Sequence, residues 1–265
     1  FARLNCEVTP LFYEMDGNFP NHHPDPTVPS NLAHLVEAVK KTKSDLGIAF
    51  DGDSDRIGAV DEKGKVVYGD MLMLIYGREI LTRKPGATFI GEVKCSQVLY
   101  SELKRLGGNP IMFKTGHSLI KAKMKEELAE LAGEMSGHMF FGDRYFGFDD
   151  AIYAACRLIE IVERSGKPLS AQLAGLPELH STAEIRVDCP AETKFAIVQR
   201  VADHYRRRGD MSDVDGVRMN FPQGWGLLRA SNTQPVLVMR FEAETDELLR
   251  QYQNEVEGVL AAARG

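Results

Sequence analysis

Three aspartates stand at alternate positions in one short loop, directly after the apolar segment at residues 47–50. Asp51, Asp53 and Asp55 repel one another unless a cation offsets their charge, and Arg56 follows at once. In a loop this spacing can turn three carboxylate oxygens toward one point, as hard cations require. Arg56 adds a group that binds phosphate. The loop therefore indicates a site for a cation and a phosphate group.

Three chemistries compete as interpretations of this loop, and the structural alternative is a solvated acidic turn, which does not explain Arg56 beside three aspartates after an apolar strand. An EF-hand calcium loop would use Glu62 as its twelfth residue, but Arg56 stands at the sixth position, which requires glycine. A haloacid-dehalogenase-like phosphatase would use Asp51 as a covalent nucleophile after an apolar strand. A magnesium site for phosphoryl transfer would use the three aspartates to hold the cation. The EF-hand fits worst, because strands rather than helices are expected around the loop.

A second polar loop has the sequence Gly-Glu-Met-Ser-Gly-His at residues 133–138. Glu134, Ser136 and His138 alternate, so their side chains can project to one side of the chain. A carboxylate that accepts from two hydroxyl groups is a common way to hold a sugar, and a histidine nearby can transfer protons near neutral pH. The alternative is a capped turn whose polar residues have no common role.

A third loop, Arg-Ala-Ser-Asn-Thr-Gln-Pro at residues 229–235, lies between two predicted strands. Arg229 offers a fork of donors that matches a phosphate group. Ser231, Asn232 and Thr233 add further donors, and their backbone N–H groups can form an anion-binding nest. The alternative is an ordinary polar hairpin turn.

Lys94 and His117 follow two other predicted strands, in Gly-Glu-Val-Lys-Cys-Ser and Lys-Thr-Gly-His-Ser. Because ligands of parallel sheets bind beyond the carboxyl ends of the strands, both side chains could reach the same site. A single histidine at the start of a helix is more often structural, so these two residues rank below the other loops.

The elements that carry these loops alternate between strands and helices up to about residue 177. Helices are predicted over 32–43 (capped by Ser30 or Asn31), 70–84 (capped by Asp70), 97–106, 117–132 and 149–164. Strands are predicted over 47–50, 57–61, 65–68, 88–93, 110–114 and 139–141. This order predicts an α/β fold, with a mixed, mostly parallel sheet that has helices on both faces.

The pattern changes after residue 177 to a β-α-β-β-β-α order. Strands are predicted over 182–187, 216–220, 224–230 and 235–242, and helices over 193–208 and 245–263, the last capped by Thr245. Closely spaced strands favour antiparallel pairing. The sequence therefore predicts a second, smaller α+β domain with an antiparallel sheet.

Composition excludes several classes of function. The net charge is −6, and no basic stripe of the kind that binds nucleic acid is present. No apolar run approaches the roughly 20 residues that span a membrane. The four cysteines show neither a metal-binding nor a disulfide pattern, so we expect reduced thiols in a cytoplasmic protein.

Taken together, the loops resemble those of the phosphomannomutase/phosphoglucomutase family, the α-D-phosphohexomutases. The sequence at 51–56 resembles the family's metal loop, which usually reads Asp-Gly-Asp-Gly-Asp-Arg, with Ser54 in place of the second glycine. The loops at 133–138 and 229–235 resemble its sugar-specificity loop and its phosphate-binding loop, and 114–118 also matches. The resemblance covers the whole chain in the family's order.

This resemblance implies the domain organisation. Residues 1–68 would be the end of domain 2 with the metal loop, 69–177 the sugar-binding domain 3, and 178–265 the phosphate-binding domain 4. The family's phosphoserine lies in a Thr-Ala-Ser-His-Asn-Pro-like loop of domain 1, and no such segment occurs here. We therefore expect a C-terminal fragment that is inactive alone.

The resemblance also implies the activity, which interconverts mannose or glucose 1- and 6-phosphates through a bisphosphorylated sugar. One Mg²⁺ would be bound by Asp51, Asp53 and Asp55, and a glucose 1,6-bisphosphate-type activator would serve the intact enzyme. The expected catalytic residues are Arg56, His138, Lys94 and His117. The expected substrate-binding residues are Glu134, Ser136, His138, Arg229, Ser231, Asn232 and Thr233.

The partner expected from the same resemblance is a hexose phosphate, with no nucleic acid and no membrane, in a monomer or weak dimer. Two alternatives stay open beside the mutase. One is the phosphatase that uses Asp51, and the other is a module that binds sugar phosphate without turnover.

Overall fold

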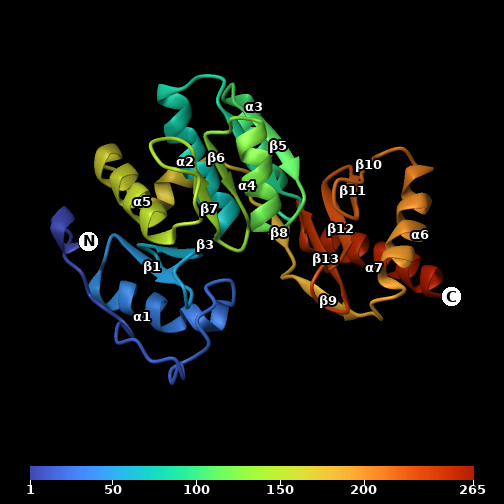
Figure 1. Ribbon diagram of the computed structural model, residues 1–265, viewed down its shortest axis with the longest axis horizontal. Helices are drawn as coiled ribbons and strands as arrows, with labels where there is room; N and C mark the ends of the chain where they lie inside the picture. The colour runs from blue at the N-terminus through green and yellow to red at the C-terminus, as the bar shows by residue number, and fades with distance from the viewer. The chain divides into compact units, whose positions relative to one another are not determined.

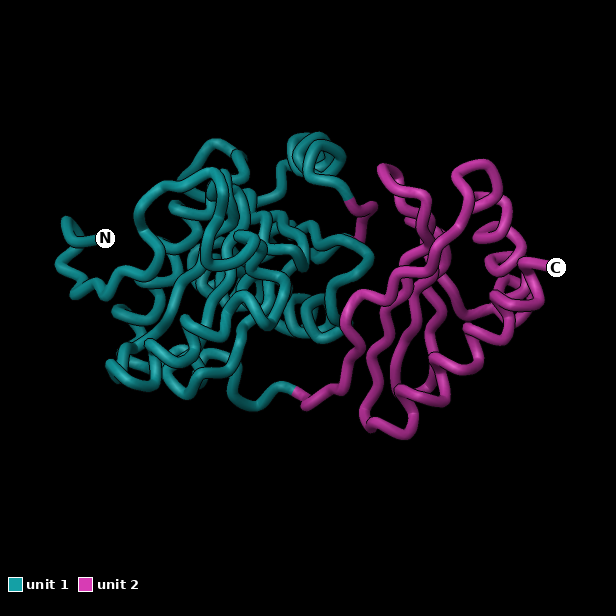
Figure 2. The backbone as a smooth tube through the Cα atoms, turned by 90° about the horizontal axis from the view of Figure 1, so that it is seen from below, with its two compact units in different colours: residues 1–111, 116–176 teal, residues 112–115, 177–265 magenta.

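The computed structural model describes residues 1–265, which form two compact units (Figure 2). Unit 1 comprises residues 1–111 and 116–176, and unit 2 comprises residues 112–115 and 177–265. None of the helices is both long and apolar enough to cross a membrane. The predicted fold class is confirmed: a mixed α/β unit is followed by a unit with an antiparallel sheet.

Unit 1 begins with a small antiparallel sheet that carries the aspartate loop (Figure 1). Its strands, in spatial order, are β1 (Leu46–Phe50), β2 (Ile57–Asp61) and β3 (Val66–Val67). Phe50 pairs with Ile57, so residues 51–56 form the turn of a β1–β2 hairpin. Helix α1 (Ala33–Thr42) packs against β1. The predicted cap of α1 is wrong: Leu32 is the N-cap, because a 3₁₀ turn at Pro29–Leu32 leads directly into the helix.

The second sheet of unit 1 has the strand order β5-β4-β6-β7. Strands β4 and β6 are parallel, whereas β6 and β7 form an antiparallel hairpin. Among the helices, α2 packs against β6, α4 against β4 and β6, and α5 against β7. The strands are β4 (Thr88–Glu92), β5 (Asn109–Phe113), β6 (Leu131–Gly133) and β7 (Met139–Phe141). The helices are α2 (Gly69–Arg83), α3 (Gln97–Arg105), α4 (His117–Glu126) and α5 (Ala151–Ser165).

Two local predictions for this sheet are wrong. The helix expected over 117–132 ends at Glu126, because Leu128 takes a left-handed conformation (φ 50°) and the Glu130 N–H donates to the Thr88 carbonyl of β4. The chain thereby enters the sheet as β6. Asp70 does not cap α2, whose N-cap is Tyr68. The Asp70 carboxylate accepts instead from the backbone N–H groups of Met71 and Ser96.

Unit 2 is an antiparallel sheet covered by two helices. The strand order is β10-β11-β12-β13-β8, and β9 also pairs with β13. Of the strand expected over 182–187, only residues 185–187 are in a strand, as part of β9, and neither β8 nor β10 was expected. The strands are β8 (His180–Ser181), β9 (Ile185–Asp188), β10 (Met211–Ser212), β11 (Val217–Phe221), β12 (Gly224–Ala230) and β13 (Val236–Ala243).

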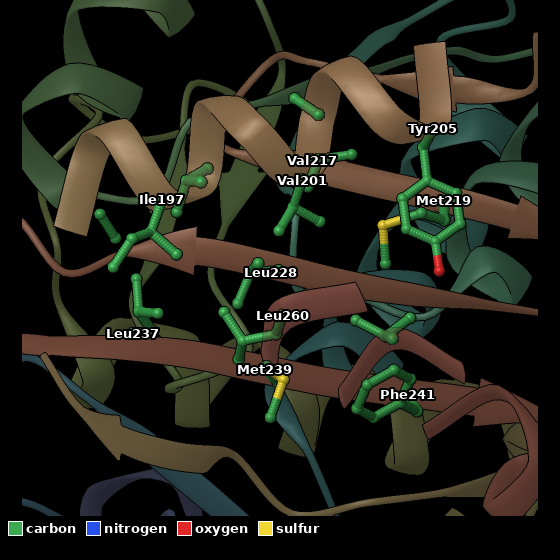
Figure 3. Packing of buried hydrophobic residues seen from close by; sticks show 14 of the residues in the cluster. Ile197, Val201, Tyr205, Val217, Met219, Leu228, Leu237, Met239, Phe241 and Leu260 are labelled. Atoms are coloured by element: carbon green, nitrogen blue, oxygen red, sulfur yellow. The ribbon is translucent and has the colours of Figure 1, made fainter. Parts of the chain in front are cut away.

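The helices of unit 2 are α6 (Lys194–Arg206) and α7 (Asp246–Arg264). The predicted cap of α7 is confirmed, because the Thr245 hydroxyl oxygen accepts from the Leu248 N–H. The core of unit 2 lies between the helices and the sheet (Figure 3). Alternate residues of the central strands, such as Leu237, Met239 and Phe241, point into this core. Their neighbours on the strands lie on the other face of the sheet.

A buried ionic cluster stabilises unit 1. Asp143, which is fully buried after β7, accepts hydrogen bonds from Arg83 (2.7 Å) and Arg157 (2.9 Å), and Lys84 lies 3.2 Å away. Burial alone would raise the pKa of Asp143, but these three cations hold that pKa well below its ordinary value. Because Arg157 is itself 2% exposed, loss of the carboxylate leaves a buried cation with less compensation.

We therefore predict that Asp143→Asn lowers the free energy of unfolding by about 3–5 kcal/mol at pH 7, as measured by urea unfolding. A carboxyl group whose pKa is lower in the folded than in the unfolded state stabilises the fold at pH values above the unfolded pKa. This stabilisation is lost as pH falls through the folded-state pKa. The wild-type advantage should therefore shrink under acid conditions. Glu126→Gln, which alters an exposed ion pair with Lys123, is the control and should change stability by less than about 0.5 kcal/mol. Equal effects of the two variants would contradict the prediction.

Candidate functional site

The aspartate loop is shaped by hydrogen bonds that the Asp51 carboxylate accepts. One oxygen accepts from the backbone N–H groups of Asp55 and Arg56, both at 3.1 Å, and the other accepts from Arg56 Nε at 2.7 Å. Asp51 is buried, and burial raises its pKa less than the hydrogen bonds and charge of Arg56 lower it. Asp51 is therefore an anion that orders the loop as well as a candidate ligand.

The three aspartates fit a hard cation. Carboxylate oxygens of Asp51, Asp53 and Asp55 lie within 4.8 Å of one another. Burial and the charges of Asp51 and Asp53 raise the pKa of Asp55, although the charge of His138 opposes them. The raised pKa means that the anionic form of Asp55 is disfavoured, and a bound cation would stabilise that form. An oxygen-only donor set of this kind suits Mg²⁺ or Ca²⁺.

The loop at 133–138 is the turn of the β6–β7 hairpin and contacts the aspartate loop directly. The Ile57 N–H donates to the Gly137 carbonyl at 3.1 Å, and the backbones of Arg56 and His138 form an isolated antiparallel β-bridge. Gly137 has φ 102°, and a Cβ at this position would lie 2.3 Å from the Ile57 carbonyl oxygen. Only glycine fits this approach, which explains the second glycine of the loop.

His138 lies between two carboxylates. Its Nδ1 is 2.6 Å from Glu134 Oε2, and its Nε2 is 3.3 Å from Asp55 Oδ2. The Ser136 hydroxyl is 3.2 Å from the same Nδ1. Burial alone would lower the pKa of His138, but the hydrogen bond and charge of Glu134, together with the charge of Asp55, raise it above its ordinary value. His138 therefore carries a proton more readily than a solvated histidine does.

Glu134 joins this loop to the start of α4. Its second oxygen accepts from the Gly116 N–H at 2.8 Å. Burial would raise the pKa of Glu134, but His138, the Gly116 N–H and Lys94 lower it. Lys94 lies 3.6 Å from the fully buried Glu92, which accepts from the Met135 N–H. Glu92 and Lys94 are thus held beside the 133–138 loop.

His117, at the first position of α4, stacks on His138 with ring centroids 5.6 Å apart. Its Nδ1 lies 3.2 Å from Asp149, which also accepts from Lys121 at 2.9 Å. Asp149 was not predicted as a site residue, because its partners His117 and Lys121 come close to it only in the folded chain. Asp25 was missed for the same reason, and it lies 3.5 Å from Arg56 Nη1.

The loop at 229–235 lies in unit 2, between β12 and β13. Arg229 is buried, and its Nε donates to Asp215 at 2.8 Å. The Ser231 hydroxyl accepts from the N–H groups of Thr233 (3.4 Å) and Gln234 (3.1 Å). These two N–H groups therefore donate within the loop rather than forming an outward nest. The side chains of Asn232 and Thr233 are exposed, so both can reach a ligand.

Comparison with known proteins gives matches along nearly the whole chain. Three phosphoglucomutase/phosphomannomutase family models match: alpha/beta/alpha domain II at residues 1–64, alpha/beta/alpha domain III at 68–180, and the C-terminal domain at 184–259.

Curated relatives include a phosphomannomutase/phosphoglucomutase of Pseudomonas aeruginosa, which is 48% identical over 261 residues, or 97% of this chain and 56% of that protein. A phosphoglucomutase of Neisseria gonorrhoeae is 45% identical over 98% of this chain and 57% of its own length. The chain thus spans little more than half of these relatives. A solved phosphoglucomutase/phosphomannomutase family structure from Burkholderia thailandensis superimposes with a TM-score of 0.90 at 43% identity, covering 99% of this chain and 56% of that one.

The junction of the two hairpins generates one prediction. Gly137→Ala should lower the free energy of unfolding by about 3 kcal/mol, because it adds left-handed strain and breaks the bond to Ile57. The Ile57 amide should also exchange with solvent faster. Gly86→Ala is the matched control, since Gly86 has φ 80° with nothing within 4 Å of the added Cβ. If both variants lose the same stability, the close approach at Gly137 is unimportant.

The His138 environment generates another prediction. In metal-free buffer, Glu134→Gln should lower the pKa of His138, because it removes the charge that outweighs burial. A histidine whose pKa is raised on folding stabilises the fold below the unfolded pKa, and this stability is lost as pH rises through the folded pKa. NMR titration of the histidine ring signals measures the pKa directly. An unchanged His138 pKa in the variant would show that Glu134 does not control its protonation.

Proposed function

The chain belongs to the phosphoglucomutase/phosphomannomutase family, and from this premise we propose that it works within a mutase that interconverts hexose 1-phosphates and hexose 6-phosphates. The reaction would pass through a phosphoserine and a bisphosphorylated sugar. The phosphoserine would come from residues outside this sequence. A glucose 1,6-bisphosphate-type compound would act as activator.

One observation carries this proposal: the junction of the aspartate loop with the loop at 133–138. The Ile57–Gly137 hydrogen bond and the Asp55–His138 contact bring candidate metal ligands beside a candidate proton carrier. Phosphoryl transfer to a hydroxyl group needs both, because phosphate charge must be offset and the hydroxyl proton must move. A solvated acidic turn would need neither contact.

Asp51, Asp53 and Asp55 would hold Mg²⁺, which when bound offsets the charge on a phosphoryl group. Arg56 would bind the same phosphoryl group. Its guanidinium group is oriented by Asp51 and lies near Asp25, so part of its fork is already fixed. A side chain that is oriented before the ligand arrives loses less entropy on binding.

His138 would move the proton in both half-reactions. When a sugar hydroxyl oxygen attacks phosphorus, the P–O bond to the serine breaks, and His138 would accept the hydroxyl proton. When the other phosphate returns to the serine, His138 would give a proton back to the sugar oxygen. Glu134 holds Nδ1, which fixes the ring for this task. Lys94 would add positive charge near the transferred group, and His117 is a further candidate catalytic residue.

Glu134 and Ser136 would hold sugar hydroxyl groups. Although both Glu134 oxygens already accept hydrogen bonds, each carboxylate oxygen has a further lone pair for a sugar hydroxyl. In unit 2, Arg229, Ser231, Asn232 and Thr233 would bind the phosphate that is not being transferred. The names of the P. aeruginosa and N. gonorrhoeae relatives support mannose and glucose phosphates as substrates. A cytoplasmic monomer or weak dimer stays a prediction.

The phosphatase alternative is less well supported. It would need Asp51 as a nucleophile, but both Asp51 oxygens accept hydrogen bonds that close the loop. A hydrogen-bonded, charge-paired carboxylate with a lowered pKa is a weaker nucleophile.

Turnover can be tested in a chimera that joins the preceding part of the P. aeruginosa relative to this chain. We expect interconversion of mannose 1- and 6-phosphate with Mg²⁺ and loss of activity in EDTA. His138→Ala should lower kcat by about 10²–10⁴-fold, because a proton carrier is lost. His180→Ala, at an exposed histidine, is the control and should keep full activity.

The products separate the alternatives. Release of inorganic phosphate without isomerisation, abolished by Asp51→Asn, would replace the mutase with the phosphatase. A folded chimera that binds sugar phosphate but converts none would favour a binding module.

A further inference from the structure

A buried lysine stands at the first position of helix α6. Lys194 is 5% exposed. Burial of an ammonium group is costly, and the positive end of the helix dipole disfavours a cation in the first turn. Both effects act against lysine here, so other contacts must compensate for them.

The compensating contacts come from the loop at 229–235. Lys194 Nζ donates to the Ser231 carbonyl at 2.6 Å and to the Gln234 carbonyl at 2.9 Å. These two carbonyls flank Asn232 and Thr233, which are both exposed. Hydrogen bonds from an ammonium group are about twice as strong as neutral ones. Lys194 therefore links the two ends of the 231–234 turn from the buried side of the loop.

Sequence composition indicates that lysine is specifically suited to this position. Lys194 is the only lysine among residues 177–265, whereas the same stretch has ten arginines. A compact ammonium with three rotatable donors can approach two carbonyl oxygens of one tight turn, whereas a planar guanidinium group is larger and has fixed donor directions. At every other Lys or Arg position of residues 177–265, the residue is arginine.

The contacts also change the charge of the loop. The negative ends of two peptide dipoles are directed at Nζ, where the ammonium offsets them. The ammonium adds a full positive charge behind the loop, in a protein interior where electrostatic interactions are stronger than in water. Both effects favour an anion at the exposed residues.

We propose that Lys194 is a positioning residue for phosphate recognition, which holds the 231–234 turn in its binding shape and raises its affinity for a phosphate dianion. This inference rests on the proposed function in assuming that the 229–235 loop binds phosphate. Lys194 itself does not touch the ligand, because its Nζ is directed at the loop carbonyls.

The test compares Lys194→Met, which removes both charge and donors, with Lys194→Gln, which keeps an amide donor without charge. Titration calorimetry with glucose 1,6-bisphosphate, on the full chain, measures affinity. Amide hydrogen exchange of residues 231–236 measures the order of the loop. We expect Lys194→Met to weaken binding at least about tenfold and to speed exchange in the loop, but not in the β12–β13 ladder.

Lys194→Gln should keep more of the exchange protection than Lys194→Met, yet it should lose most of the affinity. The comparison separates the effect of the hydrogen bonds to the loop carbonyls from the effect of the positive charge. Arg200→Met is the matched control, because it removes one cation from an exposed position of the same helix. Its affinity should stay within about twofold of wild type. If Lys194→Met fails to fold, Lys194→Gln decides between the outcomes alone.

Wild-type affinity and exchange protection in the more disruptive folded variant would overturn the proposal. Arg229→Ala distinguishes this failure from failure of the proposed function. If wild type binds no bisphosphate and Arg229→Ala changes nothing, the phosphate loop assignment fails. Faster loop exchange in the Lys194 variants would then still support the role of Lys194 in ordering the loop, and unchanged exchange would contradict that role.

Discussion

The hydrogen bond from the Ile57 N–H to the Gly137 carbonyl is the contact on which the candidate site of unit 1 depends. It joins the turns of two hairpins that are far apart in the sequence, one with the aspartates and one with Glu134 and His138. A side chain at position 137 would collide with the Ile57 carbonyl, so the approach needs glycine. Without this approach, His138 Nε2 would not lie 3.3 Å from Asp55, and each loop would be an ordinary polar turn.

Within this junction, charge is balanced unevenly. Asp51 is paired with Arg56, Glu134 with His138, and Asp149 with Lys121 and His117, and the pKa of each of these three carboxyl groups is lowered. Asp55 differs, because burial and neighbouring aspartates raise its pKa despite His138. The anionic form is therefore disfavoured at the one aspartate that lies beside both the other aspartates and His138. An added cation gains most at that point.

The candidate loops could be recognised from the sequence more readily than the elements between them. The three loops were recognisable because their residue types and spacing have few structural uses, and the strands around them followed from short apolar runs. Strand β6 was missed because Leu131 and Ala132 continue the apolar spacing of α4, and only the pairing of β6 with β4 and β7 distinguishes it from helix. Asp25 and Asp149 could not be found, because their partners Arg56 and Lys121 are close only in the folded chain.

Ser54 shows how the loops keep their shape. It takes a left-handed conformation (φ 61°) at the position where the resembling family motif has glycine, which costs about 1 kcal/mol or more for a residue with a Cβ. The cost is tolerated because Asp51 accepts from the Asp55 and Arg56 N–H groups, and the Ser54 carbonyl accepts from Ala151. Loop shape is therefore imposed by a buried anion and its partners rather than by glycine flexibility. Lys194 stands in the same relation to the loop of unit 2, as a buried cation that binds two carbonyls. In both loops a buried charge orders the backbone, so exposed residues such as Asp53, Asn232 and Thr233 can meet a ligand without first ordering the chain.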